Sequence, residues 1–154
     1  MKRIFIIVLI GFVFSTVRAQ ADNPLKGGMP NTLKLASGEV IYDLNGDWDA
    51  VWDTGGWGTY QDIIKINQKE DQFVGVYLLK GDYHLNKGKE KVKGKLKDNM
   101  IVDVSLHSVE QGAFESRWFL SQGSISKDGN EIIIKHVIEY KGATSVRTLS
   151  LKRK

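Results

Sequence analysis

Histidine is the side chain most often used for metal binding and for proton transfer near neutral pH, and it occurs at His84, His107 and His136. No two of these histidines are close in the sequence. Asp103 and His107 share one face of a predicted strand, but four residues of extended chain separate them by about 13 Å. Ligands of one metal ion must all lie within about 2 Å of it. The sequence therefore predicts no metal site.

Motifs for nucleophilic catalysis and phosphate binding are also missing from the sequence. No G-x-S-x-G segment presents a serine nucleophile. The segment Gly55-Gly56-Trp57-Gly58 lacks the lysine and the following helix of a phosphate-binding loop. It fits a hairpin loop in which glycine supplies positive φ angles. We expect a protein that is not an enzyme and has no cofactor. An enzyme that uses the mouth of a barrel is the third-ranked alternative.

A further chemical signal is the segment KGKEKVKGKLK, residues 87–97, in which every second residue is a lysine. In a strand this spacing puts all the lysines on one face, and the other face carries Val92 and Leu96. We predict that the lysine face points to solvent and that Val92 and Leu96 point inward. The alternative is a basic strip that contacts anionic lipid or polysaccharide. The lysines central to this prediction are Lys91, Lys93 and Lys95.

Aromatic and polar side chains in the predicted strands suggest a binding cavity. If Asp103, Glu115 and Arg117 face inward, they form a polar floor among apolar walls, as in many small-molecule sites. In the simpler alternative they face solvent, while the core is filled by Phe114, Trp118 and Leu120. The residues predicted to line the cavity or its mouth are Trp52, Trp57, Tyr60, Tyr77, Arg117 and Trp118.

The chain starts with features of a secretory signal peptide. Lys2 and Arg3 precede an apolar run over residues 4–14, and small residues follow at Ala19 and Ala21. We expect a signal peptide over residues 1–21 with cleavage after Ala21, or else after Ala19. An uncleaved membrane anchor is the alternative. The expected location is the periplasm or the outside of the cell.

Net charge argues against nucleic acid as a partner. The chain has 22 basic and 18 acidic residues, a net charge of +4. Removing Lys2, Arg3 and Arg18 with the signal peptide leaves 19 basic residues against 18 acidic ones, a net charge of +1. The lysine-rich segment also has no interleaved aromatic residues on which bases would stack. We expect no nucleic acid partner and no stable membrane insertion after signal cleavage.

The rest of the sequence predicts one all-β domain. Residues 22–43 contain both prolines and several glycines and read as an irregular leader. From residue 44 to 154, short segments of alternating apolar and polar residues are separated by turn signals such as Asp98-Asn99. The predicted strands cover residues 46–53, 59–68, 71–79, 89–97, 100–108, 113–126, 131–140 and 144–154.

Eight such strands with short connections pair antiparallel in sequence order. With no helix to cover a face of the sheet, closure into a barrel buries the apolar face and removes the exposed edges. We therefore predict an eight-stranded antiparallel up-and-down β-barrel over residues 44–154. A β-sandwich is the alternative.

The segment Gly46-Asp47-Trp48, at the start of the first predicted strand, resembles the Gly-x-Trp motif of the lipocalin and fatty-acid-binding (calycin) group. The resemblance implies that Trp48 closes one end of the barrel and that an arginine of the last strand packs across it. Arg147 is the expected arginine, with Arg153 as the alternative. Gly46, Trp48 and Arg147 are thus the predicted closure residues.

The spacing of Phe73-x-Gly75 and Val92-x-Gly94-x-Leu96 also resembles small bacterial exported lipocalin-like domains. The chain departs from typical lipocalins before its last strand. Lys141-Gly142 leaves no room there for the long helix of that group. Avidin-like barrels begin in a similar way, but a full set of biotin-contacting residues cannot be placed on this sequence.

The resemblance implies an exported, non-enzymatic, lipocalin-like barrel that binds a small, largely apolar ligand. The alternative is a structural or interaction module of the cell envelope, with a filled barrel and a lysine-rich outer strand. Its expected partners are anionic envelope surfaces, which it would contact weakly. A ligand-binding barrel should contain an interior pocket of about 300 Å³ or more.

Overall fold

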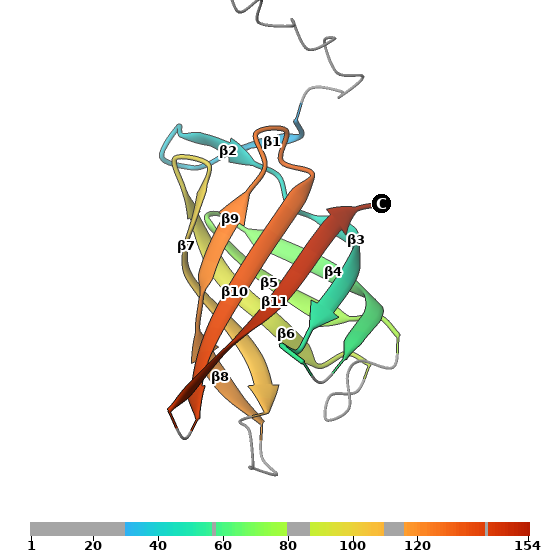
Figure 1. The fold of residues 1–154 in the computed structure, drawn as a ribbon. Helices are drawn as coiled ribbons and strands as arrows, with labels where there is room; N and C mark the ends of the chain where they lie inside the picture. Colours follow the sequence, from blue (N-terminus) through green and yellow to red (C-terminus); the bar gives the residue numbers. More distant parts are fainter. Residues whose placement is uncertain (1–29, 57, 80–86, 110–115, 141) are drawn as a thin grey trace, which may run out of the picture.

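The computed structural model describes residues 30–56, 58–79, 87–109, 116–140 and 142–154 (Figure 1). The predicted signal peptide over residues 1–21 lies outside these ranges, as do Trp57, His84, Phe114 and Glu115. Within them, no helix is long and apolar enough to cross a membrane.

The described residues form strands in two antiparallel sheets. The smaller sheet pairs β1 (Thr32–Lys34) with β2 (Val40–Tyr42). The larger sheet contains β3 (Gly46–Asp53), β4 (Thr59–Lys69), β5 (Gln72–Tyr77), β6 (Glu90–Lys97), β7 (Met100–Val109), β8 (Ser116–Leu120), β9 (Gln122–Ile125), β10 (Glu131–Tyr140) and β11 (Ala143–Arg153).

The larger sheet curls into a nearly closed barrel (Figure 1). Its strand order is β8-β7-β6-β5-β4-β3-β11-β10-β9, so the two outermost strands are consecutive in the chain. The prediction of an all-β, barrel-like antiparallel sheet is confirmed. The predicted count of eight strands is wrong, since the sheet has nine within the described part of the chain.

The extra strand arises because the segment predicted as one strand over residues 113–126 is divided at Ser121. β8 pairs with β7 before this residue, and β9 pairs with β10 after it. The chain thus crosses from one edge of the sheet to the other. Gly123 allows the close packing inside the crossing, because a Cβ atom there would lie 2.5 Å from Cγ2 of Ile101.

Turn chemistry sets the register of the hairpins. Asp98 and Asn99 have φ angles of 51° and 58°, as a two-residue turn between β6 and β7 requires. In the β9–β10 turn, Gly129 has a φ of 69° and its N–H donates to the Ser126 carbonyl. The β6–β7 hairpin agrees with the turn predicted at Asp98-Asn99.

The barrel core follows the period-two pattern of the strands. In β3, Trp48, Ala50 and Trp52 are buried while the intervening residues are exposed. The same alternation continues around the barrel. The core comprises Ile41, Leu44, Trp48, Ala50, Trp52, Ile64, Ile66, Phe73, Tyr77, Val92, Leu96, Ile101, Val104, Leu106, Ile132, Ile134, Leu149 and Leu151.

The β1–β2 hairpin lies across one end of the barrel (Figure 1). It belongs to the segment 22–43 that was expected to be an irregular leader. Ile41 and the following Leu44 are fully buried in the barrel core. The Tyr42 N–H donates to Oδ1 of Asn99 at 2.8 Å, and the Leu44 N–H donates to Oε1 of Gln68. These contacts tie the hairpin to the β6–β7 turn, and the residues that follow the hairpin to the end of β4.

Candidate functional site

The barrel end beneath the hairpin is closed by Trp48. Its side chain is fully buried, and its Nε1–H donates to the Leu44 carbonyl at 3.0 Å. The guanidinium of Arg153 lies 4.6 Å from the centre of the indole ring. Arg153 also donates to the Asp43 and Asn45 carbonyls, so it links the end of β11 to the chain before β3.

The expectation that Arg147 packs across Trp48 is therefore wrong. Antiparallel pairing of β11 with β3 puts Arg153 opposite Trp48. Arg147 lies six residues earlier in β11, opposite His136 of β10. Every second residue of β11 faces inward, and both arginines are among these residues. They differ only in which residues of the neighbouring strands lie opposite them.

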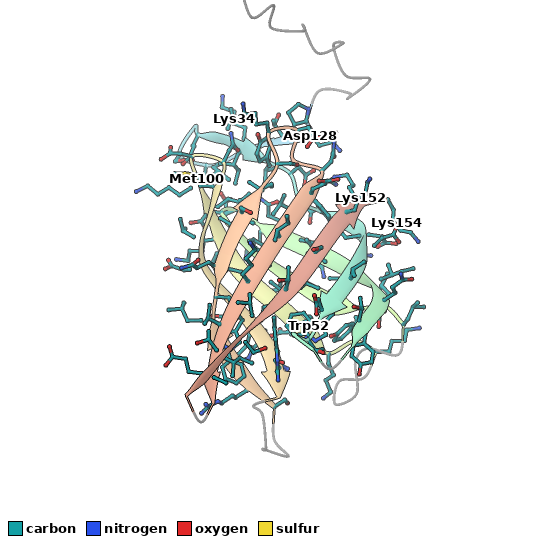
Figure 2. All side chains as sticks on the ribbon, viewed as in Figure 1. Lys34, Trp52, Met100, Asp128, Lys152 and Lys154 are labelled. Atoms are coloured by element: carbon teal, nitrogen blue, oxygen red, sulfur yellow. The ribbon has the colours of Figure 1, made fainter. Side chains whose placement is uncertain are left out.

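The opposite end of the barrel contains polar side chains. Figure 2 shows Trp52 at this end, away from the labelled Lys34, Met100 and Asp128. Lys91 lies against Trp52, with its Nζ atom 3.9 Å from the centre of the indole ring and 5.9 Å from that of Tyr77. Lys91 Nζ also donates to the His107 carbonyl at 3.0 Å. The ammonium group is thus held by two aromatic faces and a backbone carbonyl.

The prediction that Lys91 points to solvent is wrong, because its side chain is 0% exposed. A β-bulge in β6 is the cause. Gly75 of β5 pairs with Val92, but the next residue of β5 pairs with Glu90, so Lys91 is the extra residue. Both Lys91 and Val92 then face inward. The rest of the prediction is confirmed: Lys93 and Lys95 are exposed, and Val92 and Leu96 are buried.

Three further polar side chains lie near this end. Arg147 reaches from β11 to β7, where its Nη1 donates to Oγ of the buried Ser108 at 2.9 Å. His136 of β10 is also buried. Its ring centre lies 4.6 Å from that of Phe119 in β8, and its Nδ1 lies 3.3 Å from the Leu120 carbonyl oxygen. The sequence reasoning did not identify Lys91, Ser108 or His136 as members of one site.

The structure brings together only some of the predicted cavity residues. Trp52 and Tyr77 are buried beside Lys91, and Tyr60 lies opposite Trp52 at the rim, 45% exposed. Trp118 instead stacks on His107 and lies under exposed Lys93, whose Nζ is 4.2 Å from its ring centre. The remaining candidates are Arg117, which lies over Phe119 at 4.9 Å, and Trp57, which lies outside the described residues.

Two of the spaces that described residues line lie at opposite ends of the barrel. A void of about 10 Å³ beside Trp52 and Tyr77 holds one water molecule at most. A surface groove of about 490 Å³ lies at the opposite end, beneath the loop between β1 and β2. The groove has carboxylates, lysines and leucines on its walls. Across the described ranges, no group of three or more His, Asp or Glu side chains could hold a metal ion.

Burial lowers the pKa of His136 below its ordinary value, and the charge of Arg147 acts in the same direction. The contact with the Leu120 carbonyl opposes this shift. Between the lowered pKa of the folded state and about pH 6.5, the unfolded chain therefore binds a proton that the folded protein does not. Stability should fall as the pH drops from about 6.5 toward the lowered pKa of the folded state.

We expect His136→Gln to remove this part of the pH dependence. Urea denaturation of both proteins at pH 8 and pH 5 would measure it. The wild-type protein should lose more stability than the variant between these pH values. Equal losses would mean that the proton uptake of His136 is the same in the folded and unfolded states.

The barrel end at Trp48 retains the feature that the lipocalin resemblance implied, an arginine of the last strand over the tryptophan, with Arg153 in that place. The other end, with Lys91 and Arg147, is described by no motif of the sequence. No protein-family model matches this chain, and no curated protein matches it in sequence.

Proposed function

We propose that this chain is an exported, non-enzymatic, lipocalin-like barrel that binds a small, largely apolar molecule at the end that contains Trp52 and Lys91. The void of about 10 Å³ beside Trp52 is too small for such a molecule, so binding requires side chains at this end to move apart. The main support is the complete burial of Lys91 among aromatic side chains. A few placed polar groups among apolar walls are typical of small-molecule sites. Ser108 and His136, both buried, add further polar groups to a largely apolar interior.

Burial of the Lys91 ammonium group has an energetic cost. Transfer of an ammonium group from water into a protein interior costs several kcal/mol, which the surrounding contacts must offset. An apolar side chain of similar volume is often neutral or stabilising at such a place. A lysine is expected at this place if its ammonium group binds a molecule that enters the barrel.

The second candidate function is an interaction module of the cell envelope. It is supported by Lys93, Lys95 and Lys97, which are exposed on the outer face of β6. Co-sedimentation with vesicles containing anionic lipid, at low and high salt, tests this candidate. Salt-sensitive binding that is lost in the triple variant Lys93→Glu, Lys95→Glu, Lys97→Glu would favour it over the small-molecule proposal.

Two measurements test the proposed function directly. Native mass spectrometry of protein purified from its own host would reveal a co-purifying small molecule. Titration with the neutral fluorescent probe N-phenyl-1-naphthylamine would detect an apolar site even in ligand-free protein. The proposal requires saturable binding of the probe with one site per chain. Absence of both a ligand and probe binding would contradict it.

Lys91→Met should separate a binding role from a structural one. We expect the free energy of unfolding to stay the same or to rise, because methionine removes a buried charge and fills similar volume. Affinity for the co-purifying ligand should fall. Urea denaturation and ligand titration measure the two effects. The control is Lys93→Met on the outer face, which should change neither.

If Lys91→Met instead lowers the stability by more than about 2 kcal/mol, the bond to the His107 carbonyl is a structural requirement of the bulge. Unchanged ligand affinity would also count against a binding role for this lysine.

A further inference from the structure

Three exposed apolar side chains form a row across the outer face of the barrel, over β8, β10 and β11. Val137 of β10 is 52% exposed and pairs with Val146 of β11, which is 45% exposed. Leu120 of β8 is 77% exposed, and its carbonyl oxygen lies 3.3 Å from Nδ1 of His136, the residue before Val137. β10 and β11 lie side by side at the front of the barrel in Figure 1. We call Leu120, Val137 and Val146 the apolar row.

Opposite charges flank the apolar row on β10. Lys135 lies two residues before Val137 and Glu139 lies two residues after it, and both charged side chains are exposed. Four residues of extended chain separate the two charges by about 13 Å, which is too far for an ion pair between them. Their neighbours in the backbone ladders are uncharged, namely Gln122, Thr144 and Thr148. Among the residues that the structure describes, neither charge has an ion-pair partner.

This pattern of side chains is complementary to itself under a two-fold rotation. If two copies pack these faces together about a two-fold axis along the apolar row, β10 of one copy lies antiparallel over β10 of the other. Each side chain of the apolar row then meets the same side chain of the second copy. Lys135 lies over Glu139 of the second copy, and the reverse contact forms by symmetry. Two ion pairs thus form that one copy cannot form by itself.

We propose that the outer face over β10 and β11 is a docking surface for a second copy of this chain, in a dimer with two-fold symmetry. An anionic membrane fits this face less well, because Lys135 and Glu139 cancel and leave no net positive charge beside the apolar row. The inference goes beyond the proposed function, since the docking surface lies outside the barrel and the proposed ligand site lies inside it.

The size of this face predicts a weak dimer. β10 has 10 residues and is therefore about 33 Å long. Together with β11 the face is about 15 Å wide, so each copy would bury roughly 500 Å². A standard stable complex buries about 800 Å² on each partner. The dimer should therefore form only at high protein concentration.

Sedimentation velocity over a concentration series from about 10 μM to about 1 mM tests the dimer. We expect the average mass to rise from one chain toward two. Lys135→Glu and Glu139→Lys should each raise the dissociation constant at least fivefold, because each replaces two attractive contacts with two repulsive ones. Lys95→Glu makes the same change of charge on the outer face of β6 and should have no effect. A wild-type protein that stays monomeric at about 1 mM would overturn the inference.

A mixture of the two single variants tests which charges meet. In a mixed dimer the carboxylate introduced at position 135 faces the ammonium group introduced at position 139, and the native Glu139 and Lys135 face each other. We expect the mixture to associate at least fivefold more tightly than either variant alone. The double variant Lys135→Glu, Glu139→Lys should dimerise as the wild type does. If neither the mixture nor the double variant recovers the dimer, these charges are not in contact and the inference is wrong.

A lipid surface is the competing occupant of the apolar row. Val137→Ser should weaken the dimer at least threefold and leave the melting temperature nearly unchanged. Val40→Ser on β2 is the matched control, since Val40 is 53% exposed, and it should leave the dimer unchanged. If Val137→Ser leaves the mass unchanged but reduces co-sedimentation with neutral lipid vesicles, a lipid surface covers the row and the inference is overturned.

The proposed function is measured separately from the dimer. N-phenyl-1-naphthylamine binding reports on the barrel interior and requires no second copy. Probe binding by a protein that stays monomeric at about 1 mM would overturn the docking surface and leave the proposed function standing. A dimer that responds to the charge variants but binds no probe would support the docking surface and count against the proposed function.

Discussion

Trp48→Ala should lower the free energy of unfolding by roughly 3–5 kcal/mol, as the loss of a fully buried aromatic side chain does. Trp48 is 0% exposed and lies under both the β1–β2 hairpin and Arg153. The substitution would leave a cavity at the closed end of the barrel and would remove the donor to the Leu44 carbonyl. Chemical denaturation followed by tyrosine fluorescence or circular dichroism measures the loss.

Trp48→Phe separates the contribution of the buried ring from that of the hydrogen bond to the Leu44 carbonyl. Phenylalanine keeps an aromatic ring in the core but cannot donate to the Leu44 carbonyl, so roughly 1–3 kcal/mol should be lost. A loss below 1 kcal/mol for Trp48→Ala would mean that this end of the barrel contributes little to the stability. A larger loss for phenylalanine than for alanine would mean that strain, and not burial, sets the result.

Local patterns in the sequence were sufficient to predict most of the strands. Alternation of apolar and polar residues set the bounds of β3 and β10 at the residues observed, 46–53 and 131–140. The turn at Asp98-Asn99 was equally clear from residue type. These features depend on neighbours in the sequence, since each strand needs only one apolar face and each tight turn needs residues that tolerate positive φ.

Register between distant strands was harder to predict. Arg147 and Arg153 have the same phase in β11, so period-two reasoning treats them alike. The pairing of β11 with β3 distinguishes them, because the end of the last strand lies beside the start of the first. An antiparallel closed meander requires this arrangement, and applying that requirement to the sequence would have selected Arg153.

The bulge at Lys91 was missed for a different reason. Strict alternation over residues 87–97 assumes that no residue is inserted into the ladder, and a bulge reverses the phase on one side of itself. Gly75 was an available signal, because glycine within a strand often marks a bulge. A Cβ atom at Gly75 would lie 2.6 Å from Cγ1 of Val92. That close approach accompanies the change of register which turns Lys91 inward.

The contact between β8 and β10, where His136 meets Phe119, has no local signature in the sequence. His136, Phe119 and Arg147 are far apart in the sequence and meet only because the strand divided at Ser121 joins the two edges of the sheet. In the sequence, the only indication of this contact was the presence of isolated polar residues on apolar strand faces. Their common location depends on the closure of the whole barrel, which single-strand patterns do not describe.

The second large effect concerns the three consecutive isoleucines of β10. Ile134→Asp should lower the free energy of unfolding by roughly 3–5 kcal/mol, because it leaves an uncompensated carboxylate in the core. Ile134 is 0% exposed and lies between β9 and β11, opposite Gly123 on one side and Leu149 on the other. Urea denaturation, or failure to accumulate as folded protein, measures the loss.

Ile133→Asp is the matched control, since it makes the same substitution one residue away on the opposite face. Ile133 is 40% exposed and lies opposite Ser124 and Ser150, so a carboxylate there remains hydrated. It should cost about 1 kcal/mol or less, mainly through the lower β-propensity of aspartate. The difference between the two variants tests which residues of β10 face the core. If Ile133→Asp were the more damaging of the two, β10 would be rotated by one residue, and His136 would face solvent instead of Phe119.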